Sequence, residues 1–137
     1  ALSISTTVTM LVATSAIDMR RAFDGLAEAA RSVLGKDPKS GALFVFYNAR
    51  RDRLKLLWWD RSGYCLLYKR LDRGVFRIPE PTREGETSVM IEARELAMIL
   101  EGIELPPKRR PTAREIAREG REKVLRMRSD GSALSPP

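Results

Sequence analysis

The stretch LFVFYNARRDRLKLLWWDRSGYCLLYKR, residues 43–70, decides the fold of this 137-residue chain. Runs rich in aromatic and aliphatic side chains alternate there with short polar segments, a pattern that predicts consecutive β-strands. We expect strands over 43–48, 54–59 and 64–70. A polar loop and a tight turn of the type Asp-Arg-Ser-Gly connect them, so the sequence predicts an antiparallel meander.

The meander extends in both directions along the chain. The pattern predicts a fourth strand over 75–78, a brief strand over 89–91 and an earlier one over 8–13. The unbroken apolar run at 56–59 is typical of a strand covered on both faces. For the sheet as a whole we expect a helix on one face and charge on the other.

Two helices are predicted beside this sheet. Apolar residues recur at helical spacing over 16–34, where Ser15 offers an N-cap and Asp18 follows it in the manner of a capping box. Gly35 is the expected stop after this helix. Gly25 inside the helix costs about 1 kcal/mol relative to alanine, which suggests the close approach of another backbone.

The second helix is expected over 92–101, with Leu96, Ile99 and Leu100 facing inward and Gly102 ending it. These elements predict an α+β protein with a single domain over residues 1–105. In it, an antiparallel β-meander of about four to five strands packs with two helices.

Residues 106–137 form a basic tail that is expected to be helical or disordered. The net charge is +7 and the pI about 10.1, and most of the excess lies here: nine Lys and Arg against four Asp and Glu. Thr112 can cap a helix over roughly 113–127, with Glu115 at its third position. Its apolar stripe is too thin to fold alone. Polyanions are natural partners for such a charge.

The composition argues against an enzyme. There is no histidine and a single cysteine, Cys65, so no Ser-His-Asp or Cys-His constellation, no zinc site of the Cys/His type and no internal disulfide can form. No glycine-rich phosphate motif is present. We expect no cofactor and no metal, carboxylates that serve turns and surfaces, and a Cys65 that is a small buried hydrophobe.

No stretch approaches the roughly 18 apolar residues that span a membrane. The first 13 residues carry no Lys or Arg and so lack the basic start of a secretory signal. A single cysteine fits a reducing compartment. We expect a cytoplasmic protein without a membrane partner.

Basic clusters are the candidate binding sites, since arginine is suited to bidentate contact with phosphate. Each cluster can also be a solvated face. Trp58 and Trp59 can stack on bases, although at least one is expected in the core. The candidate DNA contacts are Arg50, Arg51, Arg53 and Lys55 on the first hairpin, Arg20 and Arg21 on the first helix, and Lys69 and Arg70 on the third meander strand. The basic tail helix either contacts nucleic acid or docks on a partner and folds on binding. Its candidate contacts are Lys108, Arg109, Arg110, Arg114 and Arg118.

Five blocks of the sequence, in order, carry a family resemblance. They are DMRRAFDGLA at 18–27, GALFVF at 41–46, KLLWWD at 55–60 with Gly63, KRL at 69–71 with Gly74, and LAMILEGI at 96–103. Together they resemble the TnpB accessory protein family of IS-sixty-six-type bacterial insertion sequences, from about residue 8 to residue 103. The RNA-guided nuclease of the same name is unrelated.

The resemblance implies a role in DNA transposition. In that family a separate, larger transposase carries the acidic catalytic residues, and the family pattern holds no catalytic residue to transfer. The implied partners are the transposase and the DNA of the element ends. A protein-interaction module or regulator without direct DNA contact is the alternative, and a carboxylate-based nuclease ranks last. The matching residues, whose roles are open, are Asp18, Arg20, Gly25, Trp58, Trp59, Asp60, Lys69 and Arg70.

Overall fold

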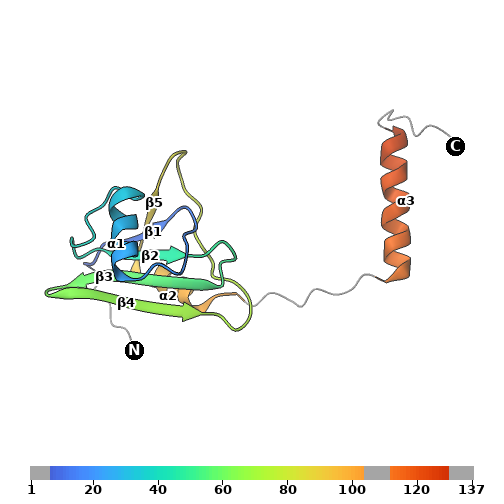
Figure 1. The fold of residues 1–137 in the computed structure, drawn as a ribbon. Coiled ribbons are helices and arrows are strands. Elements are labelled where there is room, and N and C mark those ends of the chain that lie inside the picture. The colour runs from blue at the N-terminus through green and yellow to red at the C-terminus, as the bar shows by residue number, and fades with distance from the viewer. Residues whose placement is uncertain (1–6, 104–111, 130–137) are drawn as a thin grey trace. The chain divides into compact units, whose positions relative to one another are not determined.

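The computed structural model describes residues 7–103 and 112–129, and the chain divides into two units, within 1–105 and within 106–137 (Figure 1). Among the described residues, the first unit holds a sheet and two helices, and the second holds one helix. The α+β class is confirmed. The elements in chain order are β1 (Met10–Ala13), α1 (Phe23–Ser32), β2 (Leu43–Tyr47), β3 (Arg53–Asp60), β4 (Gly63–Arg70), β5 (Ser88–Ile91), α2 (Ala93–Glu101) and α3 (Ala113–Ser129).

The sheet is mixed, with strand order β4-β3-β2-β1-β5. The meander of β2, β3 and β4 is antiparallel, as predicted, and β5 pairs antiparallel to β1. β1, however, runs parallel to β2. The helix between these two strands explains this direction, because a crossover through a helix returns the chain parallel to the strand it left.

The predicted strand over 75–78 is wrong. Its only ladder contact within the described part of the chain is an isolated bridge from Val75 to Ile103. The backbone N–H of Phe76 donates instead to the carbonyl of Arg51 at 2.6 Å. The segment therefore docks on the β2–β3 loop rather than adding a strand beside β4.

The predicted start of the first helix is also wrong, because α1 begins at Phe23 rather than near residue 16. Long-range contacts hold the preceding segment outside the helix. Its Ile17 N–H donates to the carbonyl of Tyr47 at 2.9 Å, and the carbonyls of Met19 and Arg21 accept from a lysine ammonium described below. The predicted glycine stop is confirmed, since Gly35 has a φ of 65°.

Helices cover both faces of the sheet. Lys55 lies opposite Tyr68, and its neighbour Leu54 lies opposite Lys69, so the two lysines point to opposite faces. Lys55 reaches the segment before α1, whereas Lys69 donates to the carbonyl of Leu100 in α2 at 2.6 Å. We therefore name them the α1 face and the α2 face (Figure 1).

The expectation of one covered and one charged face is thus wrong, because α1 and α2 use opposite faces. The apolar run at 56–59 predicted a strand that is covered on both faces, and this prediction is confirmed. Leu56 and Leu57 point to opposite faces and both are fully buried.

The last two helices match their predicted positions. In α2, Glu92 and Glu95 form a capping box, and Gly102, with a φ of 72°, ends the helix. In α3, the Thr112 hydroxyl accepts from the Glu115 N–H at 3.2 Å, and the Glu115 carboxylate accepts from the Thr112 N–H at 3.0 Å. Within 7–103 and 112–129, no helix is both long enough and apolar enough to cross a membrane.

Candidate nucleic-acid interface

The β2–β3 loop is a closed turn organised by Asn48. Its side-chain oxygen accepts from the N–H groups of Asp52 (3.1 Å) and Arg53 (3.0 Å), and its amide donates to the Asp52 carboxylate at 2.6 Å. This last bond is the main cause of the lowered pKa of Asp52. Sequence reasoning missed Asn48, although asparagine at the start of a polar loop signals such local bonding.

Arg50 and Arg51 in this loop face different surroundings. Arg51 has a φ of 59°, and its guanidinium lies 4.0 Å from Glu80 and 5.8 Å from the ring centroid of Tyr47. Arg50 is exposed, and no described acid forms an ion pair with it. The loop therefore presents one open arginine and one that is turned toward the body of the unit.

Two lysines predicted as DNA contacts have internal partners. Lys55 is only 5% exposed, and its ammonium donates to the carbonyls of Met19 (2.7 Å) and Arg21 (2.6 Å). Lys69 is half-buried and holds a carbonyl in the last turn of α2, where a cation is favourable. Lys55 is thus a structural residue of the α1 face, and we leave both lysines out of the proposed DNA contacts.

Arg20 and Arg21 lie before α1, not on its polar face, because that helix begins later than predicted. The Arg20 guanidinium holds both oxygens of Asp18, with a shortest contact of 2.7 Å. These hydrogen bonds lower the pKa of Asp18 from 3.8 to about 2. Arg20 therefore meets a carboxylate within its own loop.

Arg21 is exposed, and its stem explains the glycine inside α1. A Cβ on Gly25 would lie 3.1 Å from the Arg21 Cβ and 3.2 Å from its Cγ. The expectation of a second backbone at this position is wrong, because an arginine side chain lies there. The glycine lets the Arg21 stem cross the start of the helix.

Arg53 and Arg70 lie directly opposite each other at the paired ends of β3 and β4. Both are exposed on the α1 face, and no acid within the described residues forms an ion pair with either. Like charges in this position destabilise a sheet. Lys55, next to Arg53 on the same face, holds the backbone of Arg21. We call Arg21, Arg53 and Arg70 together the arginine cluster.

Tyr68 belongs to this surface and was missed from the sequence. It precedes Arg70 by two residues on β4, lies opposite Lys55 and is 49% exposed. The signal was present in the alternation of the strand, which places Tyr68 and Arg70 on one face.

The remaining candidates, two tryptophans and the cysteine, pack against other residues of the first unit. Trp58 packs against the core, as expected for at least one tryptophan. Trp59 meets Tyr64 edge-to-face at 4.9 Å, and the Lys39 ammonium lies 4.7 Å from its ring centroid. Cys65 is half-buried on β4 opposite Trp58, rather than fully buried as predicted.

In the tail, Arg114 and Arg118 are exposed on α3. Arg121 and Arg128 follow at positions that share their side of the helix, since successive residues turn by about 100°. Arg118 lies 3.7 Å from Glu122. The predicted contacts Lys108, Arg109 and Arg110 lie outside the described residues.

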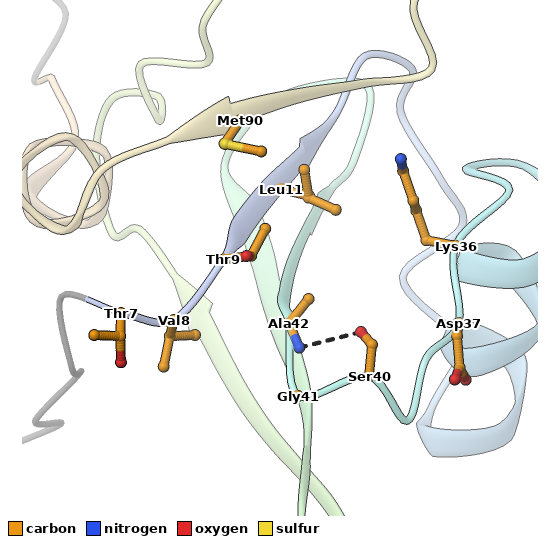
Figure 2. A pocket seen from close by; sticks show the side chains of 10 residues that line it. All are labelled: Thr7, Val8, Thr9, Leu11, Lys36, Asp37, Ser40, Gly41, Ala42 and Met90. Atoms are coloured by element: carbon orange, nitrogen blue, oxygen red, sulfur yellow. Dashed lines mark hydrogen bonds between the residues drawn. The ribbon is translucent and has the colours of Figure 1, made fainter.

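An open hollow of about 420 Å³ lies beside β1 and β5 (Figure 2). Met90 and Leu11 line it together with Lys36, and the Ala42 N–H donates to the Ser40 hydroxyl at 3.3 Å. Among the described residues of the first unit, none of the predicted DNA contacts lines this hollow. Across the parts of the chain that the structure describes, no three Asp, Glu or Cys residues are grouped so as to hold a metal ion.

Comparisons with known proteins give a family and two relatives. The family model described as IS66 Orf2 like protein matches residues 8–110. Two proteins of Sinorhizobium fredii are similar. One, printed as uncharacterized protein y4jC, is 36% identical over 77% of this chain and 88% of its own length. The other, uncharacterized protein y4hO, is 40% identical over 71% of this chain and 82% of its own. No solved structure matches.

Proposed function

Since this chain belongs to the IS66 Orf2-like family, which implies an accessory role for an insertion sequence, we propose that it is a non-catalytic DNA-binding protein of transposition. The family resemblance seen in the sequence is confirmed. We further propose that the protein acts in the cytoplasm beside the transposase of the same element. It contacts the DNA of the element ends through the arginine cluster.

The observation that carries this proposal is the pairing of Arg53 with Arg70. Two guanidinium groups in direct cross-strand register repel each other unless an anion lies between or above them. Both are exposed, and neither forms an ion pair with an acid among the described residues, although the Asp52 carboxylate interacts electrostatically with Arg53. A phosphate of the DNA backbone relieves this repulsion and accepts from both arginines.

The test is binding of the purified protein to labelled element-end DNA and to a scrambled duplex across a salt series. We expect the double substitution Arg53→Gln with Arg70→Gln to weaken binding and to reduce the slope of log affinity against log salt by about 2. Arg83→Gln with Arg94→Gln is the matched control. It removes the same charge near β5, which lies roughly 14 Å from β3 and roughly 19 Å from β4 across the sheet.

If the two double variants lose affinity equally, the contribution is net charge and not the arginine cluster. If the unmodified protein binds neither duplex at any salt concentration, the DNA-binding role fails. A preference for the element ends over the scrambled duplex separates recognition of the ends from general affinity for DNA.

Docking on the transposase is a second candidate, favoured by Met90. This side chain is 69% exposed on β5, an edge strand of the described sheet, and an extended segment of a partner protein can pair with such an edge. Met90→Glu should then abolish a transposase pull-down that survives nuclease treatment, while leaving DNA binding intact. A pull-down that nuclease removes, or that Met90→Glu leaves unchanged, contradicts docking at this edge.

A further inference from the structure

Tyr68 is an aromatic ring held in place at an open edge of the sheet. β4 is an edge strand of the sheet, and no further strand within residues 7–103 covers its outer side. The ring is 49% exposed although its neighbours on the α1 face, Lys55 and Leu57, are buried. Its position therefore leaves an aromatic surface accessible beside the arginine cluster.

Internal contacts fix the orientation of this ring. The Lys55 ammonium lies 4.6 Å from the ring centroid and is itself anchored to two backbone carbonyls. The guanidinium of Arg53 lies 3.5 Å from the phenol oxygen. One face of the ring meets the buried lysine, on the side of β3. Because the ring is already ordered, a flat ligand that stacks on its other face loses less entropy.

The two arginines lie about as far from Tyr68 as a phosphate lies from a base of the same strand. Arg70 follows Tyr68 by two residues on the same face, which is roughly 7 Å along the strand. Arg53 lies directly opposite Arg70. A base stacked on Tyr68 would thus place a phosphate of its own strand within reach of both guanidinium groups. Aromatic rings interleaved with cations are how proteins bind single-stranded nucleic acid.

We propose that Tyr68, Arg53 and Arg70 form a site for one unpaired nucleotide, so that the first unit binds single-stranded or unpaired DNA in preference to duplex. Tyr68 stacks on the base, and the two arginines hold the phosphate. The bases of an intact duplex have no free face for Tyr68, although its phosphates still reach the arginines. This inference rests on the proposed DNA-binding function and names the form of DNA that the site takes.

The test compares a fluorescein-labelled oligothymidylate with a duplex of equal length. We expect the unmodified protein to bind the single strand more tightly. Tyr68→Ala should weaken single-strand binding roughly tenfold and leave duplex binding nearly unchanged, since one stacking contact contributes on this order. Tyr68→Phe keeps the ring and should restore binding. A melting curve for each variant checks that the fold is intact.

A second measurement tests where on the protein the unpaired base binds. An oligonucleotide with 5-iodouracil, irradiated on the unmodified protein, should crosslink to a peptide that contains Tyr68. Crosslinks only to other peptides contradict the site.

The two hypotheses fail in different ways. If Tyr68→Ala changes neither form of binding, or weakens both equally, while Arg53→Gln with Arg70→Gln weakens both, the nucleotide site is wrong and DNA binding through the arginine cluster stands. If the protein binds neither the single strand nor the duplex, both are wrong. Tighter binding to duplex than to oligothymidylate also overturns the inference.

Discussion

Lys55 shows how one side chain can fix a segment of backbone. It is buried on the α1 face, and its ammonium satisfies carbonyls of Met19 and Arg21 that the late start of α1 leaves without helical partners. A buried cation is tolerated only with such hydrogen bonds. Position 55 therefore links β3 to the segment that precedes the helix.

We expect Lys55→Met to lower the free energy of unfolding by about 2 kcal/mol, because hydrogen bonds from a charged donor are lost and two carbonyls remain without a partner. Urea unfolding followed by circular dichroism measures this change. Lys36→Met is the control, since Lys36 is exposed. Equal unfolding midpoints for Lys55→Met and the unmodified protein would show that the lysine contributes nothing to stability.

Asp18 makes the stability of the folded protein depend on pH, and its partner Arg20 fixes the direction of this dependence. Hydrogen bonds from Arg20 lower the folded-state pKa to about 2, below the ordinary 3.8. The ionised form is thus favoured by folding. Its stabilising contribution is present above pH 3.8 and is lost as the pH falls through about 2. The effect is small, because the pair is exposed.

The expected result is a melting temperature that falls less between these two pH values in Asp18→Asn than in the unmodified protein. Asp24→Asn is the matched control, because Asp24 accepts none of the hydrogen bonds from Arg20. A control that behaves like Asp18→Asn would assign the acid sensitivity to other carboxyl groups.

α1 and α3 each contain one glycine, and the two glycines differ in what surrounds them. Gly25 faces the stem of Arg21, whereas a Cβ on Gly120 would meet nothing within 4 Å. Replacing glycine by alanine inside a helix normally gains about 1 kcal/mol. The Arg21 backbone is anchored by Lys55, so its side chain cannot easily move away from position 25.

We therefore expect Gly120→Ala to increase the helical circular dichroism signal. Gly25→Ala should lower the melting temperature instead, because the added methyl group presses on Arg21. It should also weaken DNA binding, because crowding at the anchored stem changes the direction in which Arg21 presents its guanidinium. A similar gain in stability from both substitutions would contradict the close contact seen in α1.

These elements also show what the sequence could predict. The boundaries of β2, β3, β4 and α2 lie within about one residue of those predicted, because their side-chain patterns are local. The start of α1 could not be found this way, since Ser15 and Asp18 form a local pattern typical of an N-terminus. Contacts from Tyr47 and Lys55, distant in sequence, override that pattern.

The candidate site was predictable to a similar degree. Arginine-rich segments marked the surface, and Arg53 and Arg70 remain exposed on it. The sequence could not show that Lys55 and Lys69 point inward, because a lysine with buried carbonyl partners has the same local pattern as an exposed one. Their roles depend on which helix covers which face of the sheet.

The whole chain consists of two units, and we propose that they are independent domains, residues 1–105 and 106–137. A chain that ends at residue 105 should unfold cooperatively at the same urea concentration as the full-length protein. Its affinity for DNA should fall uniformly across sequences, because α3 carries exposed arginines that suit phosphate contact. A lower unfolding midpoint after truncation would show that the tail stabilises the first unit.

The position of β1 between β2 and β5 has a consequence for synthesis on the ribosome. β1 is made first among the strands, yet its outer neighbour, Ser88–Ile91, is made last. A nascent chain that already holds the β2–β4 hairpins still exposes one side of β1 as an unpaired edge. Such an edge is open to pairing with other chains. A message that ends before the codon for Ser88 would thus yield an aggregation-prone product, even though most of the sheet has been translated.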